Sequence, residues 1–222
     1  MYDLKPFKEY DETVVREFVD QHPFAMIIGC DHENKPVATQ IPVFIIEQDG
    51  KQMLRGHIMK NTDHHKAFLH NPNVLVVFTS PHVYVSATWY SNPHQASTWN
   101  YISVHAKGQV KFLDDDGLIE MLRKTTLYFE GQDETSSTIY DNLSPEYTRP
   151  LMKAIVAFEI EIQEMENVFK LSQNRDAQSF HNIMVELKKK GPDGLYIAAE
   201  MEKRKKALYP EFEFPGPDID RE

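Results

Sequence analysis

The residues whose chemistry best suits a ligand are the aromatic side chains between residues 86 and 101. Both tryptophans of the chain, Trp89 and Trp99, lie in this stretch together with Tyr90 and Tyr101. Aromatic rings stack on a planar ligand, and neighbouring hydroxyl and amide groups hydrogen-bond to its polar edge. The same residue types are also enriched at subunit interfaces. The two interpretations agree if the ligand binds at an interface.

Two further segments have the chemistry of a phosphate site. In the first, Arg55-Gly56-His57 and Lys60-Asn61-Thr62 lie where a predicted strand leads into a predicted helix, which combines a cation with backbone N–H groups and polar side chains. In the second, Phe169 to Arg175, two cations and three polar side chains precede another predicted helix. As patterns alone both are weak, because most helix starts resemble the first and an ordinary capped helix explains the second.

Other kinds of site are not indicated. The sequence has no glycine-rich dinucleotide turn, no P-loop, no nucleophile elbow and no Cys-x-x-Cys pair. The single cysteine, Cys30, is interpreted as a packing residue. Asp63-His64-His65 is poorly arranged for a metal ion, because adjacent helical residues point roughly 100° apart. We therefore predict no metal site and assign no catalytic residue. A hydrogen-bonded core histidine is the simpler interpretation of His57 and of His105.

The composition is that of a soluble globular protein in a reducing compartment. The chain has 222 residues, of which 41% are hydrophobic and 26% charged, and its formal net charge is -10. One cysteine allows no internal disulfide, and the first residues lack the apolar core of a secretion signal. The longest apolar run, Val74 to Phe78, is far shorter than the about 20 residues that cross a bilayer. We expect a cytoplasmic protein without a membrane segment.

The elements that must position these residues follow from hydrophobic periodicity. Predicted strands cover residues 24–30, 37–47, 52–58, 74–79, 83–87, 100–112 and 154–162. Predicted helices cover residues 11–21, about 62–70, 114–129, 176–190 and 194–206. Consecutive strands with hairpin connections, such as the Asp49-Gly50 turn, favour an antiparallel barrel over a parallel sheet. The predicted fold class is mainly β with flanking helices (α+β).

The C-terminal part differs in charge from the acidic body. From Lys170 to Tyr209 the chain has nine cations and five anions, and four of these cations form the run Lys203, Arg204, Lys205 and Lys206. A basic helix on an acidic protein is suited to DNA or an acidic partner, although a solvated helix face is the simpler explanation. The end, residues 209–222, is rich in proline and acids, and we expect it to be flexible or to lie on the surface.

In combination, the three segments resemble the PaiB-like FMN-binding transcriptional regulators. The likeness runs from Lys5 to about Lys206. The matching strings are Gly56-His57 with Asn61, Pro81 to Ser86, Trp89-Tyr90-Ser91, Thr98 to His105, and Lys170 to Arg175. The resemblance implies an antiparallel split β-barrel, related to pyridoxine-phosphate oxidases and flavin reductases, that binds FMN between the two subunits of a homodimer. It implies a barrel domain over residues 1–165, a helical extension packed on the barrel over 166–208, and a flexible tail over 209–222.

Carried over residue by residue, the resemblance implies an FMN site on the barrel and on the loops around it. The implied contacts are Thr39, Gln40, Pro42, His57, Asn61, Trp89, Trp99, Asn100, Ser172, Gln173 and Arg175, and Lys60 is added to them for its charge and not from the resemblance. The implied regulator contacts promoter DNA through Lys203, Arg204, Lys205 and Lys206, although no helix-turn-helix is evident. Two alternatives stay open. The first is an FMN-dependent oxidoreductase that uses the same pocket, because flavin chemistry resides mainly in the cofactor. The second is a barrel without ligand that serves as an interaction module.

Overall fold

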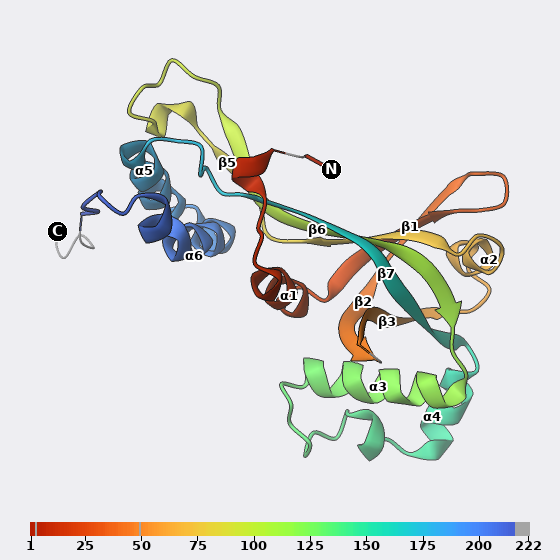
Figure 1. Ribbon diagram of the computed structural model, residues 1–222. Helices are drawn as coiled ribbons and strands as arrows, with labels where there is room; N and C mark the ends of the chain where they lie inside the picture. Colours follow the sequence, from red (N-terminus) through yellow and green to blue (C-terminus); the bar gives the residue numbers. More distant parts are fainter. Residues whose placement is uncertain (3, 49, 216–222) are drawn as a thin grey trace. The chain divides into compact units, whose positions relative to one another are not determined.

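The fold is described from a computed structural model that covers residues 1–2, 4–48 and 50–215 (Figure 1). The chain divides into two compact units. The barrel unit comprises residues 11–78 and 104–166. The helical unit comprises residues 1–10, 79–103 and the chain from Asn167 onward. The two units are described separately below, and strands β6 and β7 contribute residues to both.

The barrel unit is built from antiparallel strands that close on themselves. Its elements are α1 (Glu12–Gln21), β1 (Phe24–Cys30), β2 (Pro36–Gln48), β3 (Lys51–Met59), α2 (Asp63–His70), β4 (Asn73–Thr79), most of β6 (Thr98–Phe112), α3 (Asp115–Phe129), η3 (Tyr140–Asn142), α4 (Pro145–Met152) and most of β7 (Ile155–Lys170). The sheet order is β4-β1-β2-β3-β7-β6-β5, and β4 also pairs with β6. The first six strands of that order therefore form a closed ring, as the sequence predicts for a barrel.

The helical unit contains the remaining elements. These are η1 (Lys5–Phe7), β5 (Val83–Val85), η2 (Ala87–Trp89), α5 (Ala177–Leu187) and α6 (Gly191–Leu208). Strand β5 pairs with the first residues of β6, so that Tyr84 lies opposite Trp99. Helices α5 and α6 lie side by side (Figure 1), and Phe180, Ile183 and Ile197 are fully buried.

Side-chain caps explain where most helices begin. Asp11, Thr62, Asp114, Ser144 and Asp176 each accept a hydrogen bond from a backbone N–H in the first turn of α1, α2, α3, α4 and α5 respectively. Between β2 and β3, Gln48 pairs with Lys51 and Gly50 has a φ of +73°. This agrees with the predicted hairpin, in which Asp49 lies outside the described residues.

Some strand and helix boundaries differ from the prediction. Strand β7 continues to Lys170 instead of stopping near residue 162. Glu164 and Glu166 break the apolar alternation there, but both lie within 3.3 Å of the Lys107 ammonium on β6, so the acidic stretch is neutralised within the sheet. Strand β6 begins at Thr98 rather than Asn100, and β5 ends at Val85 because Ser86 caps η2.

The barrel has a buried interior and an outer face that α3 partly covers. Ile27, Leu54 and Phe158 are fully buried. On the other side of the sheet, Phe44 and Ala157 pack with Leu118 and Met121 of α3. Alternation along each strand therefore separates the core from the outer face on which the candidate site lies.

The predicted division at residue 165 remains a prediction, because each compact unit combines segments that are distant in the sequence. Of the predicted tail, residues 209–215 are described and 216–222 lie outside the described residues. The Tyr209 hydroxyl donates to the Arg175 carbonyl at 2.6 Å, and the Phe214 ring lies 6.1 Å from His181. No helix in the described part of the chain is long and apolar enough to span a membrane.

Candidate functional site

His57 is the central polar group on the outer face of the barrel unit. It lies on β3 opposite Ala157 of β7, and the alternation of the strand places it on the same face as Arg55. Its Nδ1 atom is buried and has no hydrogen-bond partner among the described residues. Burial lowers the His57 pKa from its usual value, so the imidazole is neutral near pH 7. A neutral ring with an unused nitrogen is suited to bind a ligand.

The turn after β3 adds a cation and an amide. Asn61 has a φ of +65°, and its backbone N–H donates to His65 Nδ1 at 3.2 Å. The Lys60 backbone N–H donates to the Ala154 carbonyl at 2.8 Å. The structure thus fixes the backbone of this turn. The Lys60 ammonium and the Asn61 side-chain amide have no hydrogen-bond or ion-pair partner in the described ranges, so both are available to an anion.

Strand β2 supplies the neighbouring surface. Pro42 pairs with Phe24 and Gln40 with Met26, which places Gln40 and Pro42 on the outer face. The adjacent pair Val43 and Gly56 brings Pro42 beside His57 on that face. Thr39 lies opposite the buried Ile27, so its side chain points to the other face of the sheet. Gln40, Pro42 and His57 therefore lie on the outer face of the barrel unit and the Thr39 side chain does not, while Lys60 and Asn61 follow in the turn after β3.

In the helical unit the predicted aromatic residues border two cavities. The first has a volume of about 540 Å³ and is lined by Thr79, Ser80, His82, Ser97, Thr98, Trp99, Tyr101, Ile102 and Lys170. The second, of about 490 Å³, is lined by His82, Val83, Tyr84, Ser86, Trp89, Trp99, Lys190 and Asp193. Trp99 separates the two cavities and is 50% exposed. Its ring centroid lies 5.8 Å from His82 and 5.7 Å from Tyr84.

Three predicted contacts of the helical unit have internal partners instead. Asn100 is fully buried, and its Oδ1 accepts a hydrogen bond from Ser172 Oγ at 3.0 Å. Gln173 Oε1 accepts from the Leu171 N–H at 2.7 Å, and its Nε2 donates to the Phe169 carbonyl. These side chains hold the chain together between β7 and α5, a role that ordinary polar residue types do not reveal in a sequence.

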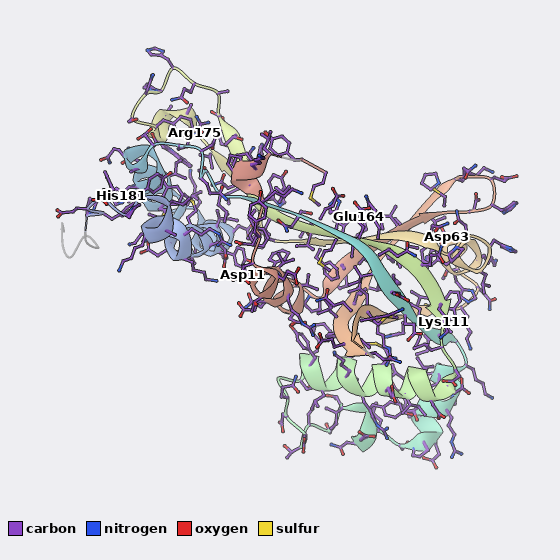
Figure 2. The ribbon with its side chains drawn as sticks, in the orientation of Figure 1. Asp11, Asp63, Lys111, Glu164, Arg175 and His181 are labelled. Atoms are coloured by element: carbon purple, nitrogen blue, oxygen red, sulfur yellow. The ribbon has the colours of Figure 1, made fainter. Side chains whose placement is uncertain are left out.

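Arg175, labelled in Figure 2 just before α5, organises the loop between η2 and β6. Its guanidinium lies 4.2 Å from the Tyr90 ring centroid and donates to the Tyr90 hydroxyl at 3.2 Å. It also donates to Gln95 Oε1. Its Nε atom is buried without a partner in the described structure. Arg175 therefore stacks on the Tyr90 ring and also holds the loop between η2 and β6 through its hydrogen bonds.

Ion pairs balance most of the predicted DNA-binding run on α6. Lys203 lies 2.5 Å from Glu200, and Lys205 pairs with Glu202. Arg204 contacts Glu200 at 2.9 Å and Glu9 at 3.2 Å, and its side chain is only 16% exposed. Lys206 has no ion pair among the described residues. Periodicity and charge counts did not show these pairings, because the acids lie one turn away on the helix or at the other end of the chain.

The outer face of the barrel unit fits a flavin phosphate in its chemistry. A dianion needs hydrogen-bond donors and positive charge, and Lys60, Asn61 and the unpartnered His57 nitrogen supply both. A closed antiparallel barrel with such a strand-to-helix turn defines the class of flavin-binding split barrels.

Comparison with known proteins identifies the family. Residues 1–164 match the family described as "putative FMN-binding domain", and the chain belongs to this family. FMN is the cofactor that the family assigns to it; when bound, FMN supplies redox chemistry through its ring.

A relative of known sequence supports the family, and two solved structures support the fold. The chain is 30% identical to the protease synthase and sporulation protein PAI 2 of Bacillus subtilis, over 93% of this chain and 99% of the relative. Among solved structures, the flavocytochrome Anf3 from Azotobacter vinelandii has a TM-score of 0.51 at 17% identity, covering 73% of this chain and 69% of that one. The FAD and heme binding protein from Mycobacterium smegmatis has a TM-score of 0.50 at 17% identity, covering 73% of each chain. The structural likeness confirms the split-barrel fold.

Proposed function

We propose that this protein is a regulatory flavoprotein, a cytoplasmic homodimer whose FMN-bound form controls transcription. The observation that carries the proposal is the whole-length likeness to PAI 2, a protein named for protease synthesis and sporulation. The likeness covers both compact units, so it concerns the complete architecture rather than the barrel alone. In this role the flavin is a sensor that needs orientation but no catalytic acid or base.

The proposed flavin contacts in the barrel unit are Gln40 and Pro42 at the ring edge, and His57, Lys60 and Asn61 at the phosphate. The unpartnered His57 nitrogen supports this assignment, because a buried polar atom without a hydrogen bond costs about 1–3 kcal/mol. A ligand that hydrogen-bonds to the ring removes that cost. Trp89 and Trp99, the ring contacts that the resemblance implies, instead border cavities of the helical unit, and they are not among the flavin contacts proposed here.

The proposed dimer is supported by the apolar outer face of the barrel unit. Phe24 is 60% exposed and Met26 38% exposed on β1, and both stand beside Pro42 and Gln40 of β2. A large exposed apolar sheet surface is typical of a subunit interface. Sedimentation or light scattering of the purified protein tests this part of the proposal.

DNA binding is proposed to involve the exposed lysines Lys203 and Lys206 of α6. Glu200 and Glu202 offset part of the positive charge of residues 203–206. If only Lys203 and Lys206 contact the phosphates, we expect weak DNA binding that depends little on the salt concentration. Fluorescence anisotropy with a labelled fragment of the protein's own promoter tests it, with and without FMN. Unchanged affinity in the double variant Lys203→Glu, Lys206→Glu would exclude these residues.

The alternative function is an FMN-dependent oxidoreductase at the same site. The observation that favours it is the His57 imidazole, whose Nδ1 has no hydrogen-bond partner among the described residues, because histidine is the side chain that most often transfers protons in enzymes. Oxidation of NADH or NADPH by the FMN-loaded protein, followed at 340 nm, separates the two functions. Turnover that His57→Gln removes would support the enzyme over the regulator.

A further inference from the structure

The larger cavity of the helical unit has an unusual charge pattern. Its wall contains aromatic and aliphatic groups, five hydroxyl groups, one imidazole and one ammonium, but no carboxylate among the described residues that line it. Its volume of about 540 Å³ is sufficient for a small organic ligand. The ammonium belongs to Lys170, one of the two cations in the predicted anion-binding segment Phe169 to Arg175.

Lys170 is a cation without a counter-ion. Its Nζ donates to Thr98 Oγ1 at 2.5 Å, which uses one of its three N–H donors. The Tyr2 ring centroid lies 5.6 Å away, so an aromatic face shields the ammonium without neutralising it. No acidic side chain pairs with it in the described part of the chain. Burial, and then Arg175, lower the Lys170 pKa, as expected where the positive charge is uncompensated.

Trp99 lines the same cavity as this ammonium. Half of its surface is exposed, and Thr98, the residue before it, holds Lys170. Tyr101 and Ile102 continue the apolar wall. A planar ring stacked on Trp99 would therefore share the cavity with the Thr98 hydroxyl and the Lys170 ammonium.

We propose that this cavity binds a planar aromatic monocarboxylate, with its ring on Trp99 and its carboxylate on Lys170 Nζ and Thr98 Oγ1. One cation matches one negative charge, and the absence of lining acids disfavours a cationic ligand. The proposal goes beyond FMN binding and does not depend on it, because the proposed phosphate contacts lie in the barrel unit. For a regulator, such a ligand is an effector; for an enzyme, it is a substrate.

The test uses the full chain and three naphthalene probes of the same shape: 1-naphthoate, 1-naphthalenemethanol and 1-naphthylmethylamine. Calorimetry should show 1-naphthoate binding about tenfold or more tightly than the alcohol, since a hydrogen bond to a charged group is stronger than a neutral one. Lys170→Met keeps the aliphatic stem and should remove this preference. Lys170→Arg should retain most of it, which controls for loss of folding.

The matched control is Lys190→Met, because Lys190 lines the second cavity at 5.7 Å from the Trp89 ring. This variant should keep the preference for 1-naphthoate. Equal binding of all three probes, or a preference that survives Lys170→Met, would overturn the proposal. Competition between FMN and 1-naphthoate would also overturn it by assigning the cavity to the flavin. Failure of FMN to bind, measured separately, would affect only the proposed function.

Discussion

His57 links the stability of the free protein to its proposed ligand. Its buried Nδ1 has no partner in the described structure, whereas Leu at this position would leave no polar atom unpaired. We expect His57→Leu to stabilise the free protein by up to about 1 kcal/mol in urea unfolding and to weaken FMN binding about tenfold. Gln52→Leu on β3, the strand that carries His57, is the control. If His57→Leu leaves FMN affinity unchanged, the imidazole is not a flavin contact.

The same residue gives a pH dependence of stability. Burial lowers the pKa of His57 in the folded protein below 6.5, its ordinary value. As the pH falls below 6.5, the unfolded chain therefore binds a proton that the folded chain does not, and folding weakens. His65 and His105 act in the same direction, because burial lowers their pKa values too. The free energy of unfolding should fall between pH 7 and 5, and His57→Leu should reduce the slope; an equal slope would contradict this origin.

At the scale of elements, the pairing of β6 with β7 depends on Gly108. A Cβ atom there would lie 2.3 Å from the Glu161 carbonyl oxygen, and backbone cannot move aside as a flexible side chain can. Gly108→Ala should destabilise the protein by about 1–3 kcal/mol, the usual cost of overpacking. Gln109→Ala, on the exposed face of the same strand, is the control. If the Gly108→Ala protein melts at the same temperature as the wild-type protein, β6 and β7 do not need a glycine at this position.

Local signals predicted these elements well where one face is buried and the ends are capped. The strand Phe24–Cys30 was predicted with its observed bounds, and α1 and α3 begin after the predicted residues Asp11 and Asp114. The second half of β7 was missed because Glu164 and Glu166 give no apolar alternation. Their partner Lys107 is distant in the sequence, and only the pairing of the strands brings it near.

For the whole molecule, the proposed dimer makes a distinct prediction. Met26→Lys places a charge on the apolar outer face beside Gln40, and burying it in an interface would require desolvation. Light scattering should show a shift from dimer to monomer. Leu195→Lys changes an exposed leucine on α6, in the helical unit, and should leave the dimer intact. A Met26→Lys protein that stays dimeric would place the interface elsewhere.

The sequence by itself determined the antiparallel barrel, the family resemblance and the aromatic residues that border the cavities. These features depend on the alternation of apolar and polar residues, on turn residues and on short sequence motifs, all of which involve residues close together in the chain. Tertiary structure alone decided which polar residues are available to a ligand. Asn100, Ser172 and Gln173 bond to each other or to the backbone, whereas His57 and Lys170 retain unused donors or acceptors. Hydrogen-bond partners come from segments distant in the chain, and a residue type does not show whether its bonding capacity is already used.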